Sequence, residues 1–271
     1  SDFDFQYEKI QVKDKNYCLI KTGRTDDTII RRKIMDFQVE IFIESCPNES
    51  IKQAQINDIP NDYARFSSAN LFCFNYFWIV IDASAANIFS ANDKSKNTSF
   101  LRNEMTILGL IGLEVDPKKE SLELHTFSTH PKHRGKGIGG YLISILLSFV
   151  KINIEQFNVE KQKYMLKQMV KKGDDINTPE EKLNYSKLEL VTVDYLKSAL
   201  AIYKKCGLEN NLNRQLFIYA YKGKWYSNQD EIIHVAKIEE NNKQGEVESG
   251  QDSEYNKVHK VILMYFEITL L

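Results

Sequence analysis

The sequence predicts an α+β fold in which a mixed central β-sheet of about seven strands is flanked by about four helices. Runs rich in β-branched and aromatic residues, typical of strands, alternate with stretches in which apolar residues recur at helical spacing. A glycine-rich loop joins one of these strands directly to one of these helices. A length of 271 residues suffices for a real core, and we expect a single domain over residues 1–271.

The composition limits the classes of protein to which the chain can belong. Hydrophobic residues make up 42% and charged residues 27%, and the formal net charge is −1, so no overall basic charge favours a nucleic-acid partner. The longest apolar run, Leu71–Ile81, is too short for a membrane helix, and we expect no membrane span. Four cysteines form no Cys-x-x-Cys pair, which argues against a metal site and for a reducing intracellular compartment. We expect the cytoplasm or nucleus, with the mitochondrial matrix as the alternative.

The first half of the chain is expected to end in a β-hairpin. Its expected elements are, in order, a strand at Tyr17–Thr22, a helix from Asp26 or Asp27 to about Cys46, a second helix between Asn48 and Phe66, a strand at Phe74–Asp82, a polar loop at Ala83–Asn97, and strands at Ile107–Val115 and Leu122–Thr129. The first helix carries Ile30, Ile34, Phe37 and Ile41 along one face, and Pro47 ends it. The turn at 116–119 makes the last two strands antiparallel.

The second half alternates helices and strands around two long polar stretches. Its expected elements are a helix from Ile138 to about Lys151, a strand at Leu188–Val193, a helix at Asp194–Lys205 ended by Gly207, and strands at Gln215–Tyr221 and Val258–Thr269. We interpret residues 153–186 and 228–256, approximately, as insertions. The first contains a basic amphipathic stretch, Lys161–Lys172, typical of a solvated helix face, with partner docking as the alternative. The second is expected to be a mobile loop.

Residues 130–140, His-Pro-Lys-His-Arg-Gly-Lys-Gly-Ile-Gly-Gly, indicate an anion site. A strand leads into them and a helix leads out. The first amides of a helix have no partner within it, and the helix dipole adds partial positive charge there. Glycines let the backbone approach a ligand closely. Together with Lys132, Arg134 and Lys136, this arrangement is suited to phosphate groups.

Three phosphate-binding loops compete for this segment. A Walker A loop requires Gly-x-x-x-x-Gly-Lys-Ser/Thr, which does not occur. A dinucleotide fingerprint matches as Gly135-x-Gly137-x-x-Gly140, but the acidic residue should end a second strand about 20 residues later. Residues 155–172, where that strand would lie, are charged and helical in pattern instead. The third pattern is Arg134-x-x-Gly137-x-Gly139, preceded by Thr129-x-Pro131.

This third pattern resembles the acyl-CoA loop of the GNAT superfamily of N-acetyltransferases, whose signature is Arg/Gln-x-x-Gly-x-Gly/Ala. The order of predicted elements is also similar to the GNAT topology. The resemblance implies that loop amides hold the CoA pyrophosphate and that the preceding strand pairs its backbone with the pantetheine arm. By position, the implied acetyl-CoA contacts are Phe127, Thr129, Arg134, Gly135, Lys136, Gly137, Ile138, Gly139 and Gly140. It implies no metal.

A second landmark concerns the chemistry. The segment from Ala199 to Leu208 is similar to the family's Ala-x-x-Leu-Tyr-x-Lys-x-Gly-Phe, in which the tyrosine serves as general acid toward the CoA sulfur. The resemblance assigns this role to Tyr203, whose phenol would stay protonated near neutral pH. Packing between helix and sheet is the alternative role. One departure is Leu196, at a position where the family often has an asparagine.

A general base is expected on the strand before the loop. Glu123 precedes Arg134 by 11 residues, the position of a general base in the histone-acetyltransferase branch of the family. Strand alternation puts Glu123, His125 and Phe127 on one face, so His125 is the alternative base. A surface carboxylate is the alternative interpretation of Glu123.

The resemblance therefore predicts an acetyl-CoA-dependent N-acetyltransferase. It would transfer an acetyl group directly, in a ternary complex, to the primary amine of a protein N-terminus, a lysine or a small molecule. The competing hypothesis is a catalytically inactive GNAT-fold subunit that serves as a structural or interaction module of a larger assembly. Leu196 and the two insertions favour the second hypothesis, whereas the intact loop and Tyr203 favour the first.

Overall fold

In a computed structural model, the chain forms one mixed sheet with helices on both faces. The structure describes residues 5–22, 28–67, 75–84, 99–100, 103–172, 183–242 and 256–270. The strands are β1 (Phe5–Val12), β2 (Lys15–Thr22), β3 (Asn75–Asp82), β4 (Gly109–Glu114), β5 (Ser121–Thr129), β6 (Lys187–Val193), β7 (Glu209–Asn210), β8 (Leu216–Tyr221), β9 (Lys224–Tyr226) and β10 (His259–Thr269). The helices are α1 (Thr28–Glu44), α2 (Glu49–Ser67), α5 (Ile138–Lys172), α6 (Lys197–Lys205) and α7 (Gln229–Asn242).

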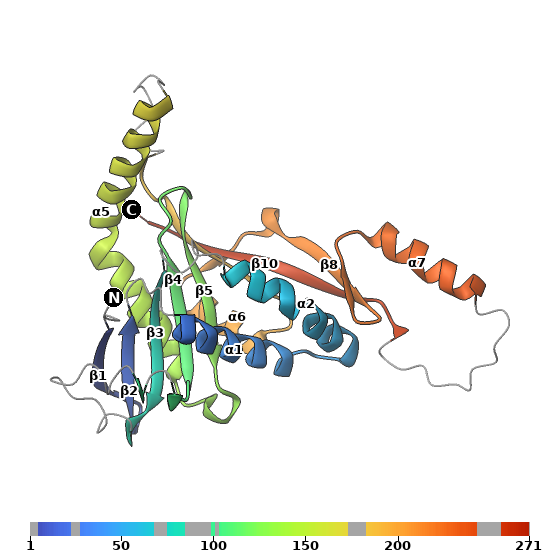
Figure 1. The fold of residues 1–271 in the computed structure, drawn as a ribbon, viewed down its shortest axis with the longest axis horizontal. Coiled ribbons are helices and arrows are strands. Elements are labelled where there is room, and N and C mark those ends of the chain that lie inside the picture. Colours follow the sequence, from blue (N-terminus) through green and yellow to red (C-terminus); the bar gives the residue numbers. More distant parts are fainter. Residues whose placement is uncertain are drawn as a thin grey trace.

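The ten-stranded sheet runs in the order β1-β2-β3-β4-β5-β6-β10-β8-β9, with β7 paired to β10. All strand pairs are antiparallel except β5 and β6. That parallel pairing covers only Ser121–Glu123 against Lys187–Glu189. Beyond Glu123 and Glu189 the two strands are no longer paired, so the sheet opens at its centre (Figure 1).

Two apolar cores cover the two faces of the sheet. On one face, α5 and α6 pack through residues such as Leu142, Leu146 and Leu200 against Trp78 and Ile111. On the other face, α1 packs through its apolar face against the intervening residues of β2, β3 and β4, which include Ile20, Ile79 and Leu110. The helical spacing of Ile30, Ile34, Phe37 and Ile41 therefore faces the sheet, because all four side chains are buried in this second core.

A bulge interrupts β5 just before the glycine loop. Gly112 of β4 faces His125, but Leu110 faces Ser128, so two residues of β5 stand against Ile111. Thr126 has a φ of +50°, as expected where one strand carries an extra residue. As a result His125 contacts Phe77 in the α1 core, whereas Phe127 packs in the α5 core. The prediction that Glu123, His125 and Phe127 share one face is therefore wrong for Phe127.

The predicted fold class is confirmed, and the sheet is larger than predicted. Each of the seven predicted strands is present, with ends displaced by a few residues. The sequence analysis missed β1, β7 and β9. It also predicted the α6 helix from Asp194, but the helix begins at Lys197. Gly207 does have a positive φ, +84°, where this helix ends. The predicted cap at Asp26 or Asp27 and most of the loop at 83–97 lie outside the described residues.

The helices extend into both stretches predicted as insertions. α5 continues to Lys172 rather than ending near Lys151, and its far half projects beyond the sheet (Figure 1). Within the second stretch, residues 229–242 form α7 instead of a loop, and residues 243–255 lie outside the described part of the chain. Ile138–Lys171 also contains an 18-residue window whose mean hydropathy, 1.5, is that of a membrane-crossing helix. A core helix has the same properties, and Leu142, Ile143 and Leu146 of α5 are fully buried against the sheet.

Candidate functional site

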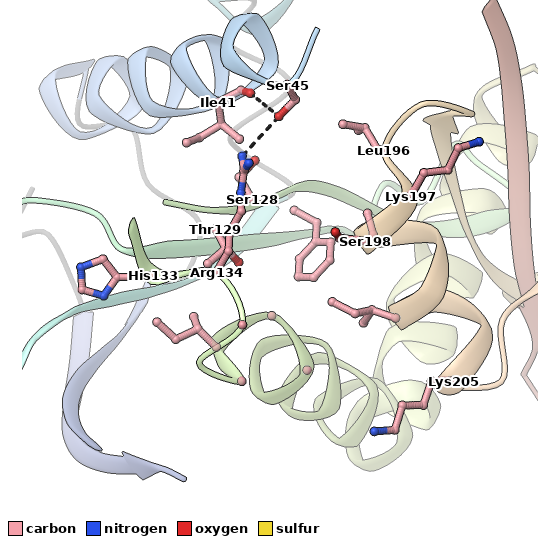
Figure 2. Close-up of a pocket in the computed structure, with 18 of the residues that line it drawn as sticks. Ile41, Ser45, Ser128, Thr129, His133, Arg134, Leu196, Lys197, Ser198 and Lys205 are labelled. Atoms are coloured by element: carbon pink, nitrogen blue, oxygen red, sulfur yellow. Dashed lines mark hydrogen bonds between the residues drawn. The ribbon is translucent and has the colours of Figure 1, made fainter. Parts of the chain in front are cut away.

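A cavity of about 1050 Å³ lies where the sheet opens. Five parts of the chain line it: the C-terminal end of β5, the glycine loop with the first turns of α5, the segment from Tyr195 into α6, the last turn of α1, and Lys13 between β1 and β2. Figure 2 shows these walls, with Arg134 and His133 on the loop side and Leu196, Lys197 and Ser198 on the α6 side. The cavity is large enough for an extended cofactor, since pockets for small molecules commonly span about 300–1,000 Å³.

The glycine loop turns twice before α5 begins. Residues 131–133 form a short 3-10 turn capped by the His130 side chain, which accepts a hydrogen bond from the Lys132 amide. Gly135 and Gly137 have φ values of +74° and +91°, which side chains other than glycine disfavour. The turns end in the first residue of α5, Ile138, whose neighbouring amides have no partner within the helix. This is the geometry of an anion site at a helix N-terminus.

Gly139 is the point of closest packing in the loop. A Cβ built at this residue would lie 3.2 Å from Ile202 Cδ1 of α6 and 3.2 Å from Phe127 Cζ of β5. Gly139 therefore lets the start of α5 approach both walls of the cavity. At Gly140 a Cβ would meet nothing within 4 Å.

The cations of the loop differ in their surroundings. Arg134 reaches across the cavity mouth, and its Nη2 donates to Ser45 Oγ at 3.3 Å; that hydroxyl in turn donates to the Ile41 carbonyl at 2.7 Å (Figure 2). Lys136 Nζ folds back onto the Lys132 carbonyl at 2.6 Å. Burial and the positive charges of Lys136, His130 and Lys15 lower the pKa of His133. The loop is thus a region of positive potential.

Eight of the nine residues predicted to bind acetyl-CoA line this cavity. They are Phe127, Thr129, Arg134, Gly135, Gly137, Ile138, Gly139 and Gly140; Lys136 is not among the lining residues. The structure thus gathers the predicted contacts around one space, although their binding role stays a prediction. Among the described residues, no three His, Cys, Asp or Glu side chains are grouped as a metal site requires.

The two predicted catalytic residues lie outside the lining of the cavity. Tyr203 is 4% exposed, and its ring packs between Phe127 and Phe266, with 5.6 Å between ring centroids in both pairs. Burial raises the pKa of Tyr203. Tyr203 is thus in contact with Phe127, which does line the cavity.

Glu123 belongs to an ion cluster at the opposite end of β5 from the loop. Its carboxylate pairs with Lys119 at 2.8 Å, and Lys119 also pairs with the buried Glu114 at 2.5 Å. Burial raises the pKa of Glu114 despite this lysine. His125, the alternative base, packs edge-on against Phe77 of the α1 core, and burial of its imidazole lowers its pKa to about 4. The imidazole is therefore neutral near pH 7.

The sequence analysis missed Tyr195, which is the tyrosine among the cavity's described lining residues. It lies just before α6 and beside Cys46, which follows α1 and whose thiol donates to the Phe42 carbonyl at 3.2 Å. Burial and the neighbouring Cys46 raise the pKa of Tyr195, and burial raises the pKa of Cys46 to about 11. No sequence signal pointed to this pair, because 149 positions separate its members (195 − 46).

Comparisons with known proteins agree with this fold. Residues 61–158 match the family model described as "Acetyltransferase (GNAT) family". No curated protein matches the sequence. Among solved structures, the chain is similar to an IAA acetyltransferase from Bacillus cereus, with 14% identity, 74% of this chain and 82% of the other covered, and a TM-score of 0.31.

Two further solved structures are similar over nearly the whole chain. One is a GNAT-family acetyltransferase of Staphylococcus aureus, with 11% identity, coverage of 99% and 100%, and a TM-score of 0.37. The other is Arabidopsis thaliana NAA60 in complex with a bisubstrate analogue, with 10% identity, coverage of 93% and 97%, and a TM-score of 0.39. Likenesses this distant carry no argument about substrate. The match to the GNAT acetyltransferase family model over residues 61–158 and the mixed sheet both agree with the resemblance found in the sequence.

Proposed function

We propose that the chain is an acetyl-CoA-dependent N-acetyltransferase that transfers an acetyl group directly to a primary amine. One observation carries the proposal: the anion site at the start of α5 opens into the same cavity as the unpaired edge of β5. A ligand with a phosphate end and a long, hydrogen-bonding arm fits that combination, and acetyl-CoA is such a ligand.

The parts of the donor would occupy different walls. The pyrophosphate would lie on the amides of residues 135–140, where the helix dipole and Arg134 favour negative charge. The pantetheine arm would pair with the backbone of Phe127–Thr129, an edge that β6 leaves free because its pairing with β5 stops at Glu123. Phe127, Ile138, Leu147 and Ile202 supply apolar wall around the arm.

The raised pKa values of two cysteine thiols at the cavity favour direct transfer of the acetyl group to the amine over an acetyl-enzyme intermediate. Burial raises the pKa of Cys206, a lining residue, and that of Cys46 beside Tyr195. Thiols of raised pKa are poor nucleophiles near neutral pH, because the thiolate is the reactive form. Transfer from CoA to the bound amine in a single step needs neither thiol.

We propose Tyr195 as the general acid that protonates the departing CoA thiolate. It lines the cavity and keeps its proton near neutral pH, since its pKa is raised. The resemblance assigns this role to Tyr203, which does not line the cavity and packs against Phe127, a residue that does. Tyr195→Phe and Tyr203→Phe distinguish the two: the acid's variant should lose about 100-fold or more in kcat while its Kd for acetyl-CoA is unchanged. Equal rates for both variants and the unsubstituted chain would remove tyrosine acid catalysis.

The acceptor is proposed to be a protein N-terminus, a lysine or a small amine. It would enter beside the last turn of α1, where Glu44 is the carboxylate among the described lining residues. Glu123 remains the proposed general base because of its position in the sequence, although its carboxylate is paired with Lys119. The kcat/KM values of Glu123→Gln and Glu44→Gln should be compared over a range of pH. The variant that lacks the general base should lose activity most at low pH.

A second candidate function is a GNAT-fold subunit without catalysis. Leu196 favours it, because an apolar side chain lines the cavity where the family often has an asparagine. Tyr203 and Glu123 both lie outside the lining of the cavity, which also favours a subunit without catalysis. Such a subunit would bind CoA without turning it over.

One experiment tests the donor half of the proposal. Acetyl-CoA at 100 times its Kd should stabilise the fold by about 2.7 kcal/mol, which raises the melting temperature by a few degrees. CoA release should then be followed with acceptor peptides and polyamines. An unchanged melting temperature at millimolar acetyl-CoA would refute the proposal, and binding without release to any amine would favour the inactive subunit.

A further inference from the structure

The N-terminal hairpin of β1 and β2 contacts the glycine loop through its turn. Lys13, in that turn, donates from Nζ to the Gly135 carbonyl at 2.9 Å, although 122 positions separate the two residues. Lys13 is also one of the residues that line the cavity. The hairpin, whose first strand the sequence analysis missed, therefore reaches the phosphate end of the proposed donor site.

The packing at Gly137 shows how closely the hairpin fits the loop. A Cβ at Gly137 would lie 3.1 Å from Lys13 Cε and 3.2 Å from Val12 Cγ1. Val12 is 6% exposed, so its side chain is fixed in the core beside the loop. Gly137 is thus needed for the approach of the hairpin as well as for its φ of +91°.

Lys13 adopts a backbone conformation that is unfavourable for lysine. Its φ is +53°, in the left-handed region where glycine and asparagine are preferred and other residues cost about 1–2 kcal/mol. A lysine at this position gains no burial, because its side chain is exposed. Backbone strain retained at a cavity rim is a reason to look for a role of the side chain.

The hydrogen bond from Lys13 also fixes a peptide of the loop. Because a trans peptide is planar, the Lys136 N–H points opposite to the Gly135 carbonyl, away from Lys13. The ammonium group thereby orients one loop amide and places a positive charge beside the amides at the start of α5. Lys15 of the same hairpin adds to the positive surroundings of His133.

We propose that Lys13 is a positioning and charge-bearing residue of the phosphate site, and that it serves the pyrophosphate of the acyl-CoA rather than its 3′-phosphate. This inference rests on the proposed function. The loop carbonyl that Lys13 holds belongs to residues 135–140, the segment expected to contact the pyrophosphate. The N-terminal hairpin is then part of the donor site.

Calorimetric titrations with CoA and with 3′-dephospho-CoA test this assignment. Lys13→Asn, which tolerates the positive φ but lacks the charge, should weaken both ligands about tenfold and make Kd less dependent on salt. Lys13→Arg should retain most of the affinity. Lys9→Asn is the matched control, because Lys9 is exposed on the same hairpin and does not line the cavity, and its affinities should be unchanged.

Lys13→Gly separates this role from a structural one. It relieves the backbone strain, so we expect a higher melting temperature together with weaker CoA binding. Unchanged affinity of Lys13→Asn, beside normal CoA binding by the unsubstituted chain, would overturn this inference alone. A loss confined to CoA and absent with 3′-dephospho-CoA would also overturn it, since the charge would then serve the 3′-phosphate. Absence of CoA binding by the unsubstituted chain would instead remove the proposed function and this inference together.

Discussion

Gly139 and Gly140, two adjacent glycines at the start of α5, have different surroundings, although both are predicted contacts of acetyl-CoA. Gly139 lies against Ile202 and Phe127, whereas Gly140 faces open space and has a helical backbone. Only the first is required by packing. The second carries the conformational cost of glycine in a helix with no contact in return.

Alanine at the two positions should therefore act differently. We expect Gly140→Ala to raise the free energy of unfolding by about 0.5–1 kcal/mol, because alanine favours the helix. Gly139→Ala should have a free energy of unfolding lower than that of Gly140→Ala by about 1 kcal/mol or more. The reason is that the new methyl group must displace Ile202 or Phe127. Urea denaturation of both variants measures the difference. Equal stabilisation by the two alanines would show that the walls around Gly139 are not closely packed.

His125 is the residue that should make stability depend on pH. Burial lowers its pKa to about 4, against 6.5 in the unfolded chain, with Glu123 opposing that shift and Lys119 adding to it. The unfolded state binds the proton more readily, so the contribution is complete above about pH 6.5 and is lost as pH falls toward 4. The loss should reach about 3 kcal/mol at most.

Unfolding free energies at pH 7.5 and pH 5 measure this effect. His125→Gln should show a shallower pH dependence than the unsubstituted chain. The exposed His234 offers a control, and His234→Gln should keep the original slope. A slope unaffected by His125→Gln would mean that the imidazole titrates normally in the fold.

The residues of the loop could be predicted because their spacing is local. Arg134, Gly137 and Gly139 lie within six positions and all line the cavity. Lys13 and Tyr195 could not be predicted, since they reach the site from elements far away in the sequence. The bulge at Thr126 could not be predicted from the sequence either. Apolar and polar residues alternate normally in the strand before the bulge and again after it.

At the scale of elements, α5 contains two halves with different surroundings. Up to Val150 its apolar side chains are buried or half-buried in the core on that face of the sheet. Farther along, Phe157 is still buried, whereas Ile152, Val159, Leu166 and Val170 are 41–79% exposed. The sequence analysis ends this helix near Lys151 because the residues that follow, 153–186, are charged and are interpreted there as an insertion. The sequence analysis also missed α7, in which only Ile232 is buried among the described side chains.

A pair of alanine substitutions tests the division of α5. Leu146→Ala should lower the free energy of unfolding by about 2–5 kcal/mol, because Leu146 is fully buried and its removal leaves a cavity. Leu166→Ala, the same change on the exposed half, should stay within about 0.5 kcal/mol of the unsubstituted chain. Chemical denaturation measures both. A large loss at Leu166 would indicate that this stripe is covered in solution.

At the scale of the whole molecule, the sheet consists of two parts joined by one short parallel pairing. Side chains reinforce that junction: Ser121 donates to Glu189 at 2.6 Å, and Arg214 and Lys187 bind the same carboxylate at 2.5 and 3.4 Å. Burial by itself would raise the pKa of Glu189, but Ser121 and Arg214 lower it on balance. The carboxylate is therefore ionised and well held at the point where the strands diverge.

Removing its charge should weaken the junction. Glu189→Gln should lower the free energy of unfolding by about 1–3 kcal/mol, because Arg214 loses its closest carboxylate in a half-buried place and Lys187 keeps only Glu267. Glu120→Gln, an exposed carboxylate at the start of β5, is the control and should be neutral. If the two variants unfold alike, the ion cluster does not hold the two parts of the sheet together.

The exposed half of α5 has a consequence for the rates at which its amides exchange with solvent. Contacts with residues 184–185 fasten the helix as far as Gln162, whose side chain donates to Asn184, while Lys161 donates to the Asn184 carbonyl. Farther along the helix, Leu166 and Val170 are 41% and 72% exposed. Deuterium should therefore enter from the far end by fraying, and reach Leu142 to Val150 only when the whole domain unfolds.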